Sequence, residues 1–313
     1  MVTDKKPIVV VGSINMDMVA FAKCIPAPGE TVGGTDFQLH PGGKGANQAV
    51  AVGRLGYPVH MIGRVGSDSF GPQLRASLRD AGVNVDCVMT TDGPSGVASI
   101  VVAEDGQNCI VVVPGANARL TAQDLDRHID VIRSAGLVLT QLETPIKTVG
   151  YLAAICHRAG VPLMLDPAPA QELPKDLLRL VTWLTPNETE ASFFVANDDP
   201  ALVGAAPNGL AKLLLEKGPA GVVLKLGSRG SYLMSTDGLS ELIPPFVVNA
   251  VDTVAAGDCF NGAFASGLMM GMRPPEAAHF ASAAAAICVT RVGAQPSMPR
   301  LDEVEQLRKL VQS

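Results

Sequence analysis

The chain lacks the sequence patterns of several common protein classes. Its 313 residues contain no C-x-x-C motif and no Cys/His pair at zinc-ligand spacing, and the six cysteines are scattered at 24, 87, 109, 156, 259 and 288. Reduced thiols in a cytoplasmic protein are therefore expected. The longest stretches without Asp, Glu, Lys or Arg, 259–272 and 277–290, are too short to span a bilayer, and no secretory leader is expected.

Motifs of the best-known nucleotide-binding and hydrolytic enzymes are also missing. The chain has no G-x-x-x-x-G-K-[ST] and no G-x-G-x-x-G after its first apolar run, which disfavours P-loop enzymes and dinucleotide-dependent dehydrogenases. H-E-x-x-H and G-x-S-x-G are absent as well. The net charge of −6 argues against nucleic acid or an anionic membrane as a partner.

What the chain has is core-forming material in an alternating pattern. Hydrophobic residues make up 47% of it, and short β-branched runs alternate with helical periodicity. This alternation predicts βαβ units, hence an α/β fold with a mostly parallel sheet covered on both faces. We expect strands at 8–12, 60–65, 137–140, 163–166, 182–185 and 221–226, and helices at 46–55, 70–81, 146–159, 188–196, 210–217, 257–270, 274–290 and 301–311.

Two stretches break the alternation. Residues 23–40 and 88–113 have strand composition and turn signals with no helix between them, and EDGQ at 104–107 is typical of a hairpin turn. They predict a small antiparallel sheet, formed by about 20–41 and 88–114, within one domain of residues 1–313. Such a sheet is suited to act as a lid over an active site, or else merely extends the core.

The segment PGGKGANQAV (41–50) places a glycine pair before a helix. Glycines allow the backbone to approach a ligand closely, and the start of a helix offers free N–H groups. Lys44 adds a cation and Asn47 adds an amide to the first turn. The alternative is a glycine-rich turn that only connects lid and helix.

The segment NAVDTVAAGDCFNGAF (249–264) points to chemistry more directly. Small residues at 255–257 lead into a helix whose first turn presents Asp258. Backbone N–H groups there form an anion hole suited to phosphoryl oxygens, and the helix dipole favours an ionised carboxylate. Asp258 could accept a proton from a substrate hydroxyl, or could simply be an acid favoured at a helix start.

Polar residues also follow the first predicted strand. In GSINMD, Asn15 and Asp17 come after the apolar run, and ligands bind at the carboxyl ends of strands in parallel α/β sheets. The two side chains suit sugar hydroxyls. A loop with Asx-turn capping is the alternative.

Together these segments resemble the ribokinase (pfkB) family of carbohydrate kinases. The resemblance runs from VVVGSINMD to GAQPSMP, with GGKGANQAV and DTVAAGDCFNGAF as its specific anchors and QLE, TPNETEA and LGSRG between them. It implies a three-layer α/β sandwich with a β-sheet lid. It also implies ATP-dependent phosphorylation of D-ribose at the 5-hydroxyl, giving D-ribose 5-phosphate and ADP.

The resemblance assigns roles residue by residue. It implies sugar contacts by Asn15, Asp17, Gly42, Gly43, Lys44, Asn47, Glu143 and Asp258, with Asp258 as the base and the N–H groups of Ala255, Ala256 and Gly257 as the anion hole. For ATP it implies Asn187, Lys225, Gly227, Ser228, Gly230, Gly257 and Ser282. For Mg²⁺ it implies Asn187 and Glu190, through water.

A monovalent cation, K⁺, and a partner are implied as well. The cation positions are Asp252, Val254, Cys288, Arg291, Gly293 and Ser297, although ordinary helix-end packing would also explain Cys288 and Arg291. The partner is a second copy, joined through the lids. Two positions depart from the family pattern: Lys225 stands where relatives often have Thr, and Cys259 where Thr or Ser is common.

Two alternatives to phosphorylation of ribose follow from the sequence. Another sugar or a nucleoside is possible as acceptor, although only 13 aromatic residues (Phe 9, Tyr 3, Trp 1) leave few platforms for stacking a nucleobase. A sugar sensor without catalysis would have no need for Asp258.

Overall fold

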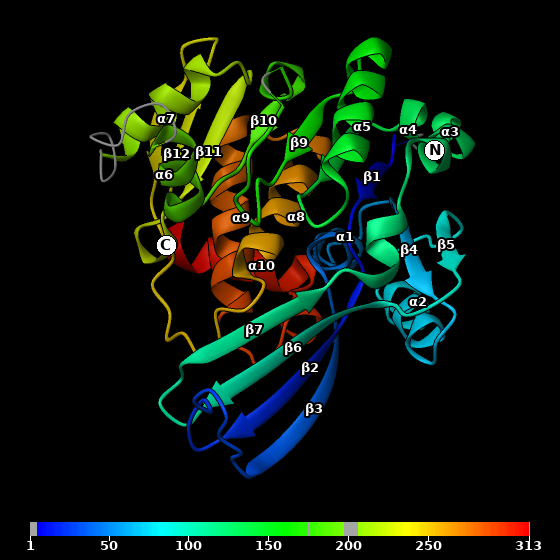
Figure 1. The fold of residues 1–313 in the computed structure, drawn as a ribbon. Coiled ribbons are helices and arrows are strands. Elements are labelled where there is room, and N and C mark those ends of the chain that lie inside the picture. The colour runs from blue at the N-terminus through cyan, green and yellow to red at the C-terminus, as the bar shows by residue number, and fades with distance from the viewer. Residues whose placement is uncertain (1–4, 175, 197–205, 313) are drawn as a thin grey trace.

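A computed structural model describes residues 5–174, 176–196 and 206–312 and arranges them around two β-sheets (Figure 1). The large sheet has nine strands in the order β13-β12-β11-β10-β9-β8-β1-β4-β5. Its strands are β1 (Ile8–Val11), β4 (Val59–Gly66), β5 (Val88–Thr91), β8 (Leu137–Thr140), β9 (Leu163–Leu165), β10 (Trp183–Leu184), β11 (Gly221–Lys225), β12 (Ser231–Ser235) and β13 (Ser240–Ile243). Among these, the pairs β11–β12 and β12–β13 are antiparallel and the others are parallel, which confirms the predicted mostly parallel sheet.

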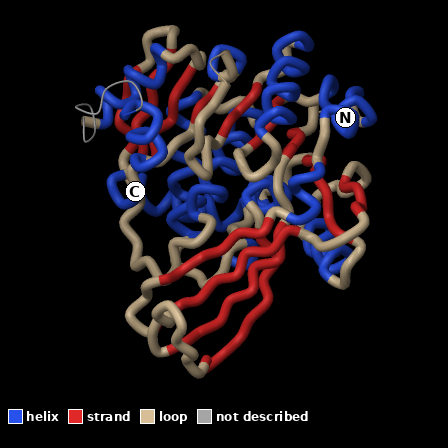
Figure 2. Tube along the Cα trace, in the orientation of Figure 1, coloured by secondary structure: helices blue, strands red, loops and turns tan. Residues whose placement is uncertain are grey.

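Helices cover both faces of the large sheet and complete three layers (Figure 2). One apolar core joins the sheet to α1 (Lys44–Arg54), α2 (Phe70–Asp80), α8 (Ala256–Met269), α9 (Pro274–Cys288) and α10 (Leu301–Gln312). The second core joins it to α3 (Ala122–Arg127), α4 (Ile129–Ser134), α5 (Ile146–Ala159), α6 (Glu188–Ala196) and α7 (Pro207–Glu216). Because both faces are covered, a central strand such as β1 is buried along its whole length.

The small sheet projects from this body and has the order β3-β2-β6-β7 (Figure 1, bottom). It contains β2 (Asn15–Ala22), β3 (Gly34–Gly42), β6 (Gly96–Ala103) and β7 (Asn108–Val113). The β2–β3 and β6–β7 pairs are antiparallel, whereas β2–β6 is parallel. The predicted hairpin turn at 104–107 is confirmed, with Gly106 at φ 85° between β6 and β7.

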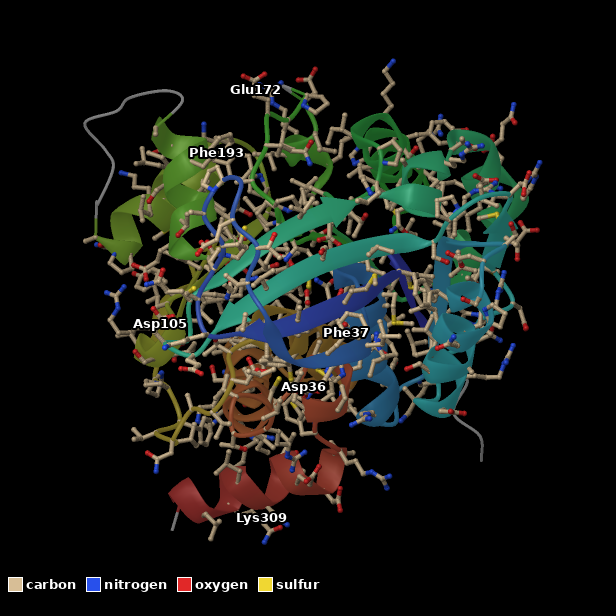
Figure 3. The ribbon with its side chains drawn as sticks, turned by 60° about the horizontal axis from the view of Figure 1, so that its bottom comes forward. Asp36, Phe37, Asp105, Glu172, Phe193 and Lys309 are labelled. Atoms are coloured by element: carbon tan, nitrogen blue, oxygen red, sulfur yellow. The ribbon has the colours of Figure 1, made fainter. Side chains whose placement is uncertain are left out.

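Apolar side chains are exposed on the small sheet. Phe37 is 54% exposed on β3, and Val111 is 59% exposed on β7. Figure 3 turns this sheet toward the viewer and labels Asp36 and Phe37 on β3 and Asp105 in the β6–β7 turn. A sheet with solvated apolar residues is a surface that proteins usually cover.

The structure corrects two boundaries of the predicted lid. Residues 88–91 form β5 and pair with β4 at the edge of the large sheet, because strand composition alone does not specify which strand is the partner. The lid was expected to begin at about residue 20, but β2 of the small sheet begins at Asn15. The small sheet therefore contains the GSINMD segment but not 88–91.

Other predicted elements agree with the structure apart from their ends. The helix expected at 274–290 ends at Cys288, and the strand expected at 182–185 spans Trp183–Leu184. Helices α3 and α4 and strands β12 and β13 were not predicted. No helix among the described residues has both the length and the apolar composition that crossing a lipid bilayer requires.

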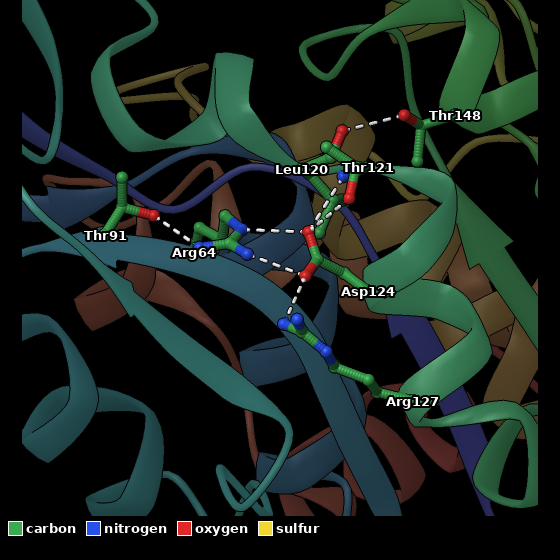
Figure 4. A network of polar contacts seen from close by, with 7 residues as sticks. All are labelled: Arg64, Thr91, Leu120, Thr121, Asp124, Arg127 and Thr148. Atoms are coloured by element: carbon green, nitrogen blue, oxygen red, sulfur yellow. Dashed lines mark hydrogen bonds and ion pairs between the residues drawn. The ribbon is translucent and has the colours of Figure 1, made fainter.

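A buried ion pair fixes α3 against the large sheet (Figure 4). Arg64 on β4 donates to both carboxylate oxygens of Asp124, at 3.0 and 2.6 Å, and to Thr91 on β5 at 2.7 Å. Asp124 also accepts from the backbone N–H of Thr121, which caps α3. The side chain of Asp124 is 1% exposed, so this network is held out of water.

Candidate active site

The predicted sugar-binding residues lie where the small sheet joins the carboxyl edge of the large sheet. Strand β1 ends at Val11 and β2 begins at Asn15, while β3 ends at Gly42 and α1 begins at Lys44. Both connections are only a few residues long. They therefore hold the polar side chains of both segments at one edge, where ligands bind in parallel α/β sheets.

Gly42 makes room for the carboxylate of Asp17. The two residues lie on the paired strands β3 and β2, and a Cβ at position 42 would lie 2.2 Å from Oδ2 of Asp17. No side chain larger than hydrogen fits there without moving the carboxylate. The neighbouring Gly43 is the N-cap of α1, with φ 88°, a conformation that glycine adopts freely.

Glu143 is fixed against the same corner. Its Oε2 accepts from Oγ of Ser13 at 2.5 Å and from the backbone N–H of Lys44 at 3.2 Å. Ser13 also receives the N–H of Gly45, at 3.3 Å. The structure thus connects Glu143, which follows β8, to the first turn of α1.

Burial and neighbouring charges shift the pKa of Asp17 and of Lys44 in this pocket. Burial, together with the charges of Glu143 and Asp258, raises the pKa of Asp17 to about 7. Burial opposes the charge on Lys44, but four surrounding carboxylates outweigh it and raise the pKa of the ammonium. Lys44 is therefore charged at neutral pH, whereas Asp17 is poised to gain or lose a proton there.

Asp258 lies in the first turn of α8 and is 6% exposed. Its Oδ2 accepts from Nδ2 of Asn47 at 3.0 Å, and its Oδ1 from Nε2 of Gln48 at 3.1 Å. Burial raises the pKa of Asp258 to about 6, while Lys44 and these amides act in the opposite direction. Burial therefore outweighs Lys44 and the two amides, yet the carboxylate remains mostly ionised at pH 7.

The backbone before Asp258 is held in an unusual conformation. Ala255, the N-cap of α8, has φ 58° and is the one non-glycine residue with positive φ in the described ranges. Such a conformation costs an alanine roughly 1–2 kcal/mol and is often found at functional sites. It turns the chain into the first turn of α8, where the N–H groups of Gly257 and Asp258 have no acceptor within the helix. Of the three N–H groups predicted for the anion hole, that of Ala256 differs from the expectation, because it donates to the carbonyl of Thr253 at 3.3 Å.

A hydrogen-bonded chain that the sequence did not suggest extends from Asp258. Nε2 of Gln48 also donates to Oδ2 of Asp166 at 2.9 Å, and Oε1 of Gln48 accepts from Gln141 at 2.7 Å. Asp166 is paired in turn with the ammonium of Lys225 at 3.1 Å. Asp166 directly follows strand β9, and its place after a strand is the signal that could have identified it, as it did Asn15.

Six of the seven residues predicted to bind ATP line a cavity of about 360 Å³ that reaches the start of α8, whereas Asn187 is not among its lining residues. The wall is apolar at Phe246, Val248 and Phe260. The predicted residues that line it are Lys225, Gly227, Ser228, Gly230, Gly257 and Ser282. Gly257 belongs to the first turn of α8, so the cavity reaches the start of the helix that carries Asp258.

Asn187 and Glu190 hold each other at the start of α6. Glu190 accepts from the backbone N–H of Asn187 at 2.8 Å and from its Nδ2 at 2.9 Å, and Asn187 Oδ1 accepts the N–H of Glu190. Burial raises the pKa of Glu190. Within the described ranges, no group of three or more His, Cys, Asp or Glu side chains is arranged to hold a metal ion.

The residues expected around a monovalent cation lie before α8 and between the end of α9 at Cys288 and the 3₁₀ helix Gln295–Ser297. Asp252 accepts from the N–H groups of Val254 at 2.9 Å and Gly293 at 2.8 Å. Sγ of Cys288 lies 3.0 Å from Oγ of Ser297. Arg291 pairs with Glu303 on α10, so its side chain has a structural partner. Cys259 is 1% exposed and packs in the core beside α9.

Comparison with known proteins identifies the family of the chain. The model of the pfkB family of carbohydrate kinases matches residues 5–301, and the chain belongs to this family. A ribokinase from Bacillus subtilis is 43% identical over 303 residues, covering 96% of this chain and 98% of its own length. A ribokinase from Schizosaccharomyces pombe is 40% identical, covering 95% and 96%.

Solved structures show the same fold. The crystal structure of ribokinase from Thermotoga maritima has a TM-score of 0.90 at 38% identity, covering 97% of this chain and 99% of that one. Ribokinase from Arabidopsis thaliana, solved in complex with ribose and ATP, has a TM-score of 0.90 at 35% identity with the same coverage. The expected ribokinase-like fold is confirmed.

Proposed function

We propose that this kinase transfers the γ-phosphoryl group of ATP to the 5-hydroxyl of D-ribose, giving D-ribose 5-phosphate and ADP. The observation that carries the proposal is the position of Asp258. Its carboxylate meets Asn47 and Gln48 on one side, and its helix start opens into the cavity on the other. Relatives about 40% identical over their full length are ribokinases, which supports ribose as the acceptor.

In this proposal Asp258 is the base. With a pKa of about 6 the carboxylate is mostly ionised at neutral pH. This pKa is also close to the working pH, where a general base is most effective. The hydroxyl proton moves to the carboxylate as the oxygen attacks phosphorus and the bond to the ADP oxygen breaks. The first-turn N–H groups of α8 stabilise charge on the transferring group.

The sugar is held by the residues at the junction of the two sheets. Asn15, Asp17, Asn47 and Glu143 supply donors and acceptors for hydroxyls, and Lys44 supplies a cation. The Oδ1 atom of Asn47 is buried without a protein partner among the described residues, which suits a hydroxyl donor. The small sheet acts as a lid that excludes water, itself a competing nucleophile.

ATP occupies the cavity, with Gly227, Ser228 and Gly230 along one wall and Ser282 along another. Mg²⁺ neutralises phosphate charge when bound. The carboxylates of Glu190 and Asp166 and the amide of Asn187 fit it as hard oxygen donors, acting through water because Glu190 already accepts two hydrogen bonds. Lys225 adds charge at the phosphate end of the cavity.

K⁺ would be held by the loops at 252–254 and 288–297. Oxygen atoms of Asp252, Ser297 and the backbone at Val254, Cys288, Arg291 and Gly293 form the hard donor set that such a cation prefers. Bound there, the cation would stabilise the loop that leads into Ala255.

The proposed oligomer is a homodimer in which the small sheets cover each other. Exposed apolar residues on β3 and β7 support it. Val111→Glu and Phe37→Glu should shift the molar mass in solution, measured by light scattering, from dimer to monomer. A monomeric mass for the unaltered protein contradicts the proposal.

The deciding experiment measures ADP release from Mg·ATP with pentoses, hexoses and nucleosides, each in K⁺ and in Na⁺. Strong turnover with ribose, raised by K⁺, supports the activity and the cation site. Turnover with another acceptor would change the proposed substrate and leave the proposed mechanism unchanged. Binding of ribose without any turnover indicates a sensor.

A further inference from the structure

Asn117 lies where the small sheet is attached to the body, and no sugar-binding role was assigned to it above. It belongs to the 3₁₀ helix η1 (Gly115–Arg119), which is separated from β7 by Pro114 alone, and it is 1% exposed. Its side chain reaches the first residue of β2. Three hydrogen bonds hold it there, and together they determine the orientation of two amides.

The backbone of Ile14 fixes the amide of Asn117. The N–H of Ile14 donates to Oδ1 of Asn117 at 2.9 Å, so that atom must be the carbonyl oxygen. Nδ2 of Asn117 then donates to the carbonyl of Ile14 at 3.2 Å. Because a peptide N–H only donates, the opposite orientation of this amide would place the NH₂ group of Asn117 against the N–H of Ile14, and neither could accept.

The amide of Asn117 in turn fixes the amide of Asn15. Nδ2 of Asn117 donates to Oδ1 of Asn15 at 2.7 Å, the shortest of the three contacts. The oxygen of Asn15 is thereby used inside the protein. Its Nδ2 makes no hydrogen bond to any other residue that the structure describes, and it remains as a donor.

Gly96 leaves the space in which this contact forms. It is the register partner of Asn15 on β6, and a Cβ there would lie 2.2 Å from both Nδ2 of Asn117 and Oδ1 of Asn15. A side chain at position 96 would therefore occupy the position of the hydrogen bond itself. Three segments of the chain, at 15, 96 and 117, are arranged around this one contact.

We infer that Asn117 is a positioning residue for the acceptor sugar: it holds Asn15 with its NH₂ group toward the sugar, so that Asn15 can only donate. The inference rests on the proposed function. A hydroxyl oxygen accepts from this NH₂, and an acceptor that lacks that hydroxyl loses the contact. Asn117 thus contributes to the choice of sugar through the orientation of Asn15, without contacting the sugar itself.

Asn117→Asp tests this directly. The carboxylate still accepts from Ile14 N–H but has no hydrogen to give to Asn15, so the Asn15 amide turns its NH₂ toward Asp and its oxygen toward the sugar. We expect Kd for ribose, measured by calorimetry without nucleotide, to rise about tenfold. KM for ribose should rise with it while KM for ATP stays unchanged. Asn208→Asp, an exposed site on α7, is the matched control and should alter neither.

A double-mutant cycle separates positioning from general damage. In an Asn15→Ala background, Asn117→Asp should have no further effect on Kd for ribose, because the group it orients is gone. Additive losses overturn the inference. So does an unchanged Kd in an Asn117→Asp variant that unfolds at the wild-type temperature.

A measurement on the unaltered protein covers the case in which the variant does not fold. In a ¹H–¹⁵N spectrum with labelled asparagine, ribose should shift the side-chain NH₂ signals of Asn15. Signals of Asn15 that do not move at saturating ribose overturn the inference. Failure of the wild-type protein to bind or phosphorylate ribose refutes the proposed function instead, which keeps the two failures distinct.

Discussion

The side-chain nitrogen of Gln48 lies 3.1 Å from Oδ1 of Asp258 and 2.9 Å from Oδ2 of Asp166. One amide on α1 thereby connects the proposed base with the carboxylate that pairs with Lys225. Its own oxygen is held by Gln141, so the NH₂ group cannot turn away. Gln48 keeps both carboxylates in place, and its hydrogen bond favours the charged form of Asp258.

Replacing Gln48 by Leu should raise the pKa of Asp258, because a hydrogen bond to the charged form is lost. Activity needs the ionised base, so the acid limb of the kcat–pH profile should move from near 6 to higher pH, by about one unit. Gln73→Leu on the surface of α2 serves as control and should leave the profile in place. An unshifted limb in Gln48→Leu would show that the amide does not act on the base.

Asp258→Asn should lower kcat at least ~10²-fold, the low end of general-base contributions. The same change should stabilise the fold at pH 8. The pKa of Asp258 in the folded state is raised from the ordinary value of 3.8 to about 6, so the wild-type protein loses stability as the pH rises between these two values. The asparagine of the variant does not titrate, so the variant avoids this loss.

The gain for Asp258→Asn at pH 8 should be about 1–3 kcal/mol and should vanish near pH 4. Urea unfolding at the two pH values measures it. A variant less stable than wild type at both would contradict the burial argument.

Ala255→Gly should keep the activity, because glycine adopts positive φ without strain, and should change stability by no more than about 1 kcal/mol. Ala255→Val should lower both kcat and the unfolding temperature, since a β-branched residue strongly disfavours that conformation. Steady-state kinetics and thermal unfolding of the pair check this. Equal kcat for the two variants would count against a role for the Ala255 backbone.

Lys225→Thr removes the ion pair to Asp166 and the charge at the phosphate end of the cavity. KM for Mg·ATP should rise several-fold, while Kd for ribose should stay the same because the sugar residues lie on the other side of Asp258. Initial rates at varied ATP, together with calorimetry of ribose, measure both. A changed Kd for ribose with an unchanged KM for Mg·ATP would show that Lys225 acts on the sugar and not on the nucleotide.

Asp124→Ala should destabilise the fold by about 3–5 kcal/mol, because it leaves Arg64 buried without its partner (Figure 4). Arg127, the second arginine paired with Asp124, has a side chain that is 64% exposed. Arg127→Met should therefore lower the free energy of unfolding by no more than about 1 kcal/mol. Denaturant unfolding of the two variants checks the contrast. Similar losses for both would mean that burial does not set the strength of this network.

The sequence predicted those parts of the fold and the site that local patterns encode. The α/β alternation, the helix start at Asp258 and the hairpin turn at Gly106 each depend on neighbouring residues, and the structure contains all three. The partner of strand 88–91 depends on residues far away in the chain, so it was assigned to the wrong sheet. Gln48 and Asn117 act through hydrogen bonds that span 93 or more positions, and no local pattern marks them. Asp166 carries a local signal, its place directly after strand β9, which was not used to predict the site.

The two halves of the proposed site come from two halves of the chain. Apart from Asp258, the residues assigned to the sugar end at Glu143, and those assigned to ATP begin at Asn187. Substitutions in the first half can therefore change the acceptor while the phosphoryl donor and its chemistry are inherited intact. Kinases of this kind can therefore evolve specificity for new sugars by substitutions before residue 144, while the residues after 186 that bind ATP stay the same.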